Sequence, residues 1–169
     1  ETIENVNEVV SIQSKSDKKF DEINVLGVLR DVLKTVSLPL QEAHAELDLN
    51  VDDSIYIKGL YAYVESIFLN LLTNSLRYKS DQRKCKIAIS AQVKGQFCYI
   101  KFTDNGIGMD MDKVKSKLFG MYKTFHNHPD SKGVGLFITK NQIEAMGGKI
   151  EVDSYPEKGT TFTLKFYSL

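Results

Sequence analysis

The sequence has no tryptophan, no net charge, few prolines and no long hydrophobic run. Its 22 basic residues equal its 22 acidic residues, and no stretch gathers Lys and Arg between aromatic side chains. We therefore expect no nucleic-acid partner. No apolar run approaches the about 20 residues that span a bilayer, and the N-terminus lacks a charged segment followed by an apolar one. We expect a soluble, cytoplasmic fragment that is not membrane-inserted, whether or not its parent protein is membrane-anchored.

The chain has only two cysteines, Cys85 and Cys98, which lie in separate strand-like runs. Neither has a second cysteine close by or a histidine at the spacing of a metal site. This pattern predicts two reduced, buried thiols and argues against a zinc site or a disulfide framework.

With 169 residues, 42% of them hydrophobic, the chain can bury one substantial core. We expect one domain over residues 21–169. Residues 1–20 carry sparse apolar positions followed by a polar run, which predicts a linker or the tail of a preceding helical domain. Because the sequence starts at Glu1 rather than at Met, we expect a piece of a longer protein, and we expect the isolated domain to be a monomer.

Hydrophobic periodicity predicts three helices, one single strand and two hairpins. The helices are expected at about 25–45, 61–76 and 134–146, the strand at 45–51, and the hairpin strands at 84–93 with 97–103 and at 149–155 with 160–167. Asn24 is a plausible N-cap of the first helix, and Pro39 lies late enough to bend or end it. This order predicts an α+β fold, a two-layer sandwich in which about three helices cover a mixed β-sheet.

A segment without clear periodicity runs from Asp104 to about Lys132. Loops of this length are uncommon in compact domains, and they usually serve as lids or binding loops. Glycines flank the segment at both ends, where they allow a hinge and a close approach to a ligand. We therefore predict a mobile lid.

The second predicted helix carries polar residues along one edge, Asn70, Asn74, Arg77 and Tyr78, at spacings of three and four. An amide oxygen is a hard, neutral ligand suited to Mg²⁺, and an arginine one turn further can neutralise phosphate charge. The alternative is an amphipathic helix whose polar face happens to hold two asparagines. Taken alone, this motif favours the alternative.

A second motif, Asp104, Gly106 and Gly108, follows a predicted strand. A carboxylate at a strand end can accept a hydrogen bond from an exocyclic amine, and the glycines let the chain turn beneath a flat ring. An ordinary Asp-Asn-Gly turn is the alternative.

Two further motifs lie at the start of the third predicted helix and at the start of the last predicted strand. Residues 133–136, Gly-Val-Gly-Leu, open the third helix, where backbone N–H groups and the helix dipole favour an anion, although one Gly-x-Gly is weak evidence. Thr160 and Thr161, in Lys-Gly-Thr-Thr-Phe, could serve a ligand or simply populate a hairpin.

Taken in order, the four motifs resemble the GHKL ATP-binding superfamily and, within it, the sensor histidine kinases. The resemblance covers about residues 20–167 and implies a Bergerat-type ATP-binding fold. "NLLTNSLRY" resembles the N box, "DNGIG" the G1 box, "LFGMYKTF" the F box, "GVGL" the G2 box and "KGTTF" the G3 segment.

The resemblance implies a role for each matching residue. Asn70 would hold Mg²⁺, Asn74 and Arg77 would face the phosphates, and Tyr78 would pack on adenine. Asp104 would receive the adenine amino group. Thr161 would be a polar link to the base. Lys123 would reach the phosphates, and it would be a catalytic residue together with Asn70 and Arg77. The remaining implied nucleotide contacts are Gly106, Ile107, Gly108, Gly133, Val134, Gly135, Leu136 and Thr160.

Three departures from the family pattern stand out. Ser131 replaces the first glycine of the G2 box, and Tyr122 stands where a second F-box phenylalanine is common. No phosphoacceptor histidine motif is present, and His44, His126 and His128 are interpreted as surface residues.

The resemblance implies a cofactor pair, ATP and Mg²⁺, and two partners. The γ-phosphate would pass to a histidine on a separate dimerisation domain of the same kinase and then to a response-regulator aspartate. A GHKL hydrolase or ATP-driven clamp is one alternative. A degenerate nucleotide-binding module that only docks a partner is another.

Overall fold

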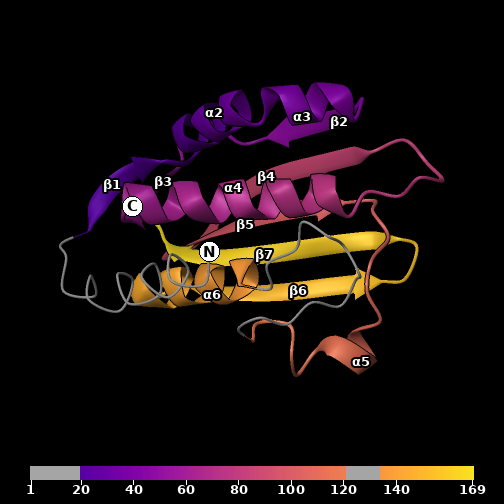
Figure 1. Cartoon of the computed structure of the whole chain (residues 1–169). Helices are drawn as coiled ribbons and strands as arrows, with labels where there is room; N and C mark the ends of the chain where they lie inside the picture. Colours follow the sequence, from indigo (N-terminus) through magenta and orange to yellow (C-terminus); the bar gives the residue numbers. More distant parts are fainter. Residues whose placement is uncertain (1–19, 121–133) are drawn as a thin grey trace.

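The computed structural model describes residues 20–120 and 134–169 of the chain. Its centre is a five-stranded sheet in the order β2-β4-β5-β7-β6 (Figure 1). The strands are β2 (Glu46–Asn50), β4 (Lys86–Lys94), β5 (Phe97–Asp104), β6 (Lys149–Tyr155) and β7 (Gly159–Tyr167). β2 pairs with β4 in parallel and the other neighbours are antiparallel, so the sheet is mixed as predicted.

Helices α2 (Val25–Thr35), α3 (Ser37–Glu42), α4 (Tyr61–Arg77) and α6 (Gly135–Ala145) cover this sheet. The short helix α5 (Met111–Val114) lies apart from them, near β6 (Figure 1). α4 lies between α2 and α6 and contacts both of them and β5 (Figure 1). The Phe68 ring of α4 lies 5.3 Å from the Phe102 ring of β5, and both side chains are fully buried. The predicted α+β sandwich is confirmed.

The predicted helix over 25–45 is wrong in one respect, because it is two helices that meet at Val36. Pro39 has no N–H to donate to the carbonyl of Thr35, and its ring would press on that carbonyl in a continuous helix. Asn24 caps α2 as predicted, since its Oδ1 accepts a hydrogen bond from the Gly27 N–H at 2.8 Å.

Two short strands escaped the sequence analysis, β1 (Asp21–Asn24) and β3 (Tyr56–Gly59), which pair antiparallel. Each has four residues, too few for an alternation to stand out. A bridge between Ile57 and Ser168, with a hydrogen bond from the Leu169 N–H to the Tyr56 carbonyl, connects β3 to the chain end that follows β7.

The described part of the predicted lid contains α5, whose N-cap Asp110 accepts a hydrogen bond from the Asp112 N–H at 3.1 Å. Residues 121–133, and with them Tyr122, Lys123, His126, His128, Ser131 and Gly133, lie outside the described residues.

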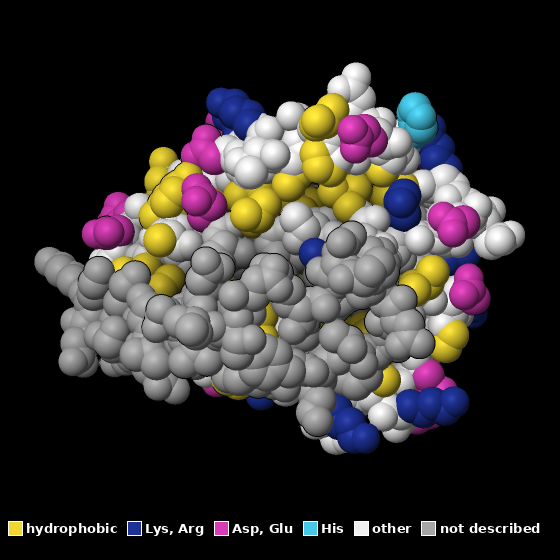
Figure 2. Space-filling model, viewed as in Figure 1, with side chains coloured by type: hydrophobic (Ala, Val, Ile, Leu, Met, Phe, Trp, Pro, Cys, Tyr) yellow, Lys and Arg dark blue, Asp and Glu magenta, His cyan; other side chains and the backbone are white. Residues whose placement is uncertain are grey.

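Cys85 and Cys98 are buried free thiols, as predicted, and His44 is exposed. In the face that Figure 2 shows, basic and acidic side chains are interspersed over the described surface. Within residues 20–120 and 134–169, no helix combines the length and apolar character needed to cross a membrane.

Candidate functional site

Five parts of the chain meet where most of the predicted site residues lie. They are the C-terminal half of α4, the end of β5, the loop after β5, the first turn of α6 and the β6–β7 hairpin. Hydrogen bonds and close approaches between these parts, described below, hold the predicted residues in one place.

Asn70 joins α4 to α6. Its Nδ2 donates a hydrogen bond to Thr139 Oγ1 at 2.6 Å, and Thr139 is almost fully buried. A Cβ atom at Gly135 would lie 2.6 Å from Asn70 Oδ1, so a larger residue there would displace the Asn70 side chain. The structure therefore brings Asn70 together with the described part of the predicted glycine turn, Val134, Gly135 and Leu136.

Asn74 and Arg77 lie on the last turns of α4, and both are half-buried. Arg77 Nη1 lies 3.4 Å from Asn74 Oδ1, a long hydrogen bond. Tyr78 is the C-cap of α4, and its carbonyl accepts a hydrogen bond from the Ile107 N–H at 2.9 Å. This bond fixes the end of the helix to the loop after β5.

Asp104 is the last residue of β5, and three donors reach its carboxylate. Ser75 Oγ donates to Oδ2 at 3.0 Å, and the Gly106 N–H donates to Oδ1 at 2.9 Å. The Thr160 N–H is the third donor. Burial raises the pKa of Asp104, and the three hydrogen bonds oppose that rise because they stabilise the ionised form.

The loop after β5 lies against the β6–β7 hairpin. Gly108 has φ +66°, and a Cβ there would lie 1.9 Å from the Tyr155 carbonyl oxygen, so this position requires glycine. The Met109 N–H donates to Ser154 Oγ at 2.9 Å, and the Glu157 N–H donates to the Ile107 carbonyl at 2.7 Å. The loop is therefore clamped between α4 and the hairpin.

Arg83, which the sequence analysis missed, holds the same loop from its other side. Its Nε donates to the Asn105 carbonyl at 2.6 Å and its Nη2 to the Gly106 carbonyl at 2.5 Å. Its Nη1 lies 3.8 Å from Glu157 Oε2. No spacing in the sequence signals this arginine, because its partners lie 22 and 23 positions further along the chain.

The two predicted threonines of β7 face opposite sides of the sheet. Thr160 pairs in register with Asp104, and Phe162 pairs with the buried Phe102. These four side chains therefore lie on the same side of the sheet. Thr161 pairs with Thr103 on the other side, and their hydroxyl oxygens are 3.1 Å apart. Strand alternation therefore directs the Thr161 side chain to the face of the sheet opposite that of Thr160.

Phe119 of the predicted F box lies at the edge of the described lid segment. It is half-buried and packs against the core, and Lys140 Nζ of α6 lies 5.5 Å from its ring centroid. Phe119 therefore contacts α6, the helix whose Thr139 accepts the hydrogen bond from Asn70 of α4.

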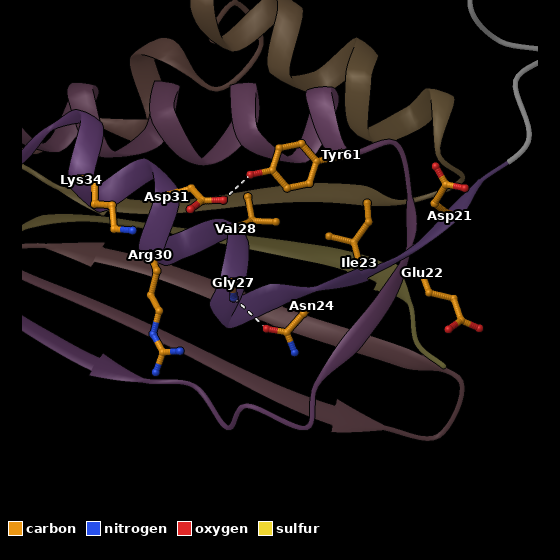
Figure 3. A pocket seen from close by; sticks show the side chains of 10 residues that line it. All are labelled: Asp21, Glu22, Ile23, Asn24, Gly27, Val28, Arg30, Asp31, Lys34 and Tyr61. Carbon is orange, nitrogen blue, oxygen red and sulfur yellow. Dashed lines mark hydrogen bonds between the residues drawn. The ribbon is translucent and has the colours of Figure 1, made fainter.

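A separate hollow of about 530 Å³ lies beside β1, α2 and the start of α4 (Figure 3). Tyr61 Oη donates to Asp31 Oδ2 there at 2.5 Å, and this bond raises the pKa of Tyr61 to about 12. The lining includes none of the predicted site residues. Since α4 has 17 residues, its Tyr61 end lies about 25 Å from the Tyr78 end, so the hollow is distinct from the candidate site.

Residues 60–168 match the family described as histidine kinase-, DNA gyrase B- and HSP90-like ATPases. The chain is 32% identical over 146 residues to the heme sensor protein HssS of Staphylococcus saprophyticus, covering 86% of this chain and 31% of HssS. It thus spans about a third of that relative's length.

Two solved structures share the fold. The catalytic domain of histidine kinase ThkA matches with a TM-score of 0.77 and 18% identity, and the match covers 89% of this chain and 98% of the solved ThkA domain. Full-length ShkA in complex with AMPPNP matches with a TM-score of 0.79 and 20% identity, over 99% of this chain and 36% of ShkA's. The chain is also 28% identical over 168 residues to the sensor histidine kinase WalK of Bacillus subtilis, covering 94% of this chain and 27% of WalK. Because the family match spans more than half of the chain, this protein belongs to the histidine kinase-, DNA gyrase B- and HSP90-like ATPases, as an ATP-binding domain of the sensor histidine kinase kind.

Proposed function

We propose that this chain binds Mg-ATP and donates the γ-phosphate to a histidine on a separate dimerisation domain of its parent kinase. A response-regulator aspartate then receives the phosphoryl group. Residues 21–169 form the catalytic domain in this proposal, and the acceptor histidine lies outside the chain.

The observation that carries the proposal is the arrangement of the Asp104 carboxylate. A carboxylate offers about four acceptor positions, and Ser75, Gly106 and Thr160 occupy three of them. One position remains for the exocyclic amine of adenine, and guanine presents an acceptor at the corresponding place. Ile107 and Tyr78, joined by a backbone hydrogen bond, would contact the base in this proposal.

Asn70 supports a site for the cation and the phosphates. Because its amide nitrogen is engaged by Thr139, its Oδ1 is oriented toward Gly135 at the start of α6. An oxygen at this place fits Mg²⁺, which takes few protein ligands and completes its shell with water and phosphate. The cation, when bound, neutralises phosphate charge, and Arg77 and Asn74 add donors on the same helix.

Phosphotransfer rather than hydrolysis is favoured by the residue one turn before Asn70. GHKL hydrolases resembling this chain place a glutamate there as general base, and this chain has Ser66, which cannot act as a base near neutral pH. Glu65 is displaced by about 100° around α4 and is exposed. The domain therefore positions ATP without activating water.

Calorimetric titration with a nonhydrolysable ATP analogue, with and without Mg²⁺, tests nucleotide binding. Mixing the domain with the histidine domain of its parent and γ-³²P-ATP tests transfer. We expect Mg²⁺-dependent binding, label on the histidine domain and no label on the fragment alone. Rapid hydrolysis by the fragment alone, lost in Glu65→Gln, would favour the hydrolase. Undetectable nucleotide binding would favour a docking module.

A further inference from the structure

Ser75 lies on α4 directly after Asn74, and only 5% of it is exposed. Its hydroxyl faces two acceptors, Asp104 Oδ2 at 3.0 Å and the Leu71 carbonyl at 3.2 Å. A hydroxyl carries one proton, so it donates fully to one acceptor at a time. The ionised carboxylate is the stronger and nearer acceptor, and the Leu71 carbonyl remains available when that carboxylate is protonated.

We propose that Ser75 is a positioning residue for Asp104, holding Oδ2 so that the one remaining acceptor position of the carboxylate meets the adenine amino group. This inference rests on the proposed function. Of the three donors to Asp104, the other two are backbone N–H groups of Gly106 and Thr160. Ser75 is therefore the donor that a side-chain substitution can remove.

The groups around Asp104 simplify the interpretation of its titration. Ser75 approaches from α4, Gly106 from the loop and Thr160 from β7. Cys85 interacts with Asp104 from the start of β4, but burial and the nearby carboxylate raise the pKa of this thiol, so it stays neutral in acid. The Arg83 side chain donates to the carbonyls of Asn105 and Gly106, the two residues after Asp104.

The direct test is an NMR titration of the Asp104 side-chain carboxyl carbon in the unliganded domain. Ser75→Ala removes a donor that favours the ionised form, so we expect the pKa of Asp104 to rise by about one pH unit. Ser75→Thr keeps the hydroxyl and should restore the native value. Thr73→Ala is the matched control, because Thr73 Oγ1 donates to the Asn70 carbonyl on the same helix. It should leave the Asp104 titration unchanged.

The second measurement is ATP affinity as a function of pH. In Ser75→Ala we expect about three- to tenfold weaker binding at pH 7 and a loss of binding on acidification that begins at higher pH. Thermal stability separates this effect from unfolding, since alanine has the higher helix propensity and leaves no buried hydroxyl. If the alanine variant does not fold, Ser75→Cys replaces it in both measurements. Cysteine is close to serine in volume, and its S–H is only a weak donor.

The outcomes separate the two proposals. An Asp104 titration that is identical in Ser75→Ala and the native domain overturns the positioning role. A native domain that binds no ATP, with a shifted titration in Ser75→Ala, overturns the proposed function and supports the positioning. Native binding with unchanged affinity and pH profile in Ser75→Ala overturns the inference alone.

Discussion

Asn70 of α4 donates a hydrogen bond to Thr139 of α6 in the candidate site, with Nδ2 and Oγ1 2.6 Å apart. Thr139→Val keeps the shape of the side chain and leaves the Asn70 amide unpaired. We expect weaker Mg²⁺-dependent nucleotide binding, by about 1 kcal/mol, and a small loss of stability. Calorimetry with and without Mg²⁺ measures the first effect and thermal unfolding the second.

Asn70→Ala should abolish Mg²⁺-dependent nucleotide binding, because it removes the amide oxygen that we assign to the cation. The fold should persist, since Asn70 is half-buried on the polar edge of α4. Unchanged affinity with a normal circular dichroism spectrum would contradict the cation assignment.

Asp104→Asn should weaken ATP binding by about 1 to 3 kcal/mol. The amide presents two donors where the carboxylate accepted, so it meets the Ser75 hydroxyl or the Gly106 N–H with a donor. The native domain should prefer ATP to GTP. Equal binding of the two nucleotides would rule out this role for Asp104.

Gly108→Ala should distort the loop, because φ is +66° and the new Cβ would lie 1.9 Å from the Tyr155 carbonyl oxygen. We expect loss of stability and of nucleotide binding together. Gly95→Ala is the matched control, since Gly95 has φ +62° and no atom lies within 4 Å of the place that its Cβ would take. It should cost about 1 kcal/mol of stability and leave the Kd for ATP unchanged.

Tyr61 gives a pH prediction at the separate hollow. Its pKa is raised to about 12 by the hydrogen bond to Asp31, above the ordinary value of about 10. The contribution of the Tyr61–Asp31 hydrogen bond to the free energy of unfolding is therefore fully present below pH 10. It is lost as the pH rises toward 12. Absorbance titration should show Tyr61 ionising near pH 12, and Asp31→Asn should lower its pKa.

Local periodicity predicted the strands and the hairpins, and the resemblance to the GHKL superfamily implied that Asn70, Asp104 and Gly135 share one site. Neither predicted Arg83, Ser75 or Thr139, whose partners lie 22, 29 and 69 positions away. Local periodicity carries no information on such pairs.

The pairing of β5 with β7 has a kinetic consequence. The β4–β5 and β6–β7 hairpins join neighbouring segments, whereas Asp104 meets Thr160 only after the long intervening chain closes. Closing such a loop is entropically unfavourable and slows folding. A ligand that contacts Asp104 and α6 binds only the closed chain, and at a hundred times its Kd it would stabilise that state by about 2.7 kcal/mol. Bound nucleotide would therefore stabilise the folded state in which β5 pairs with β7. Removal of the nucleotide should speed the separation of these two strands.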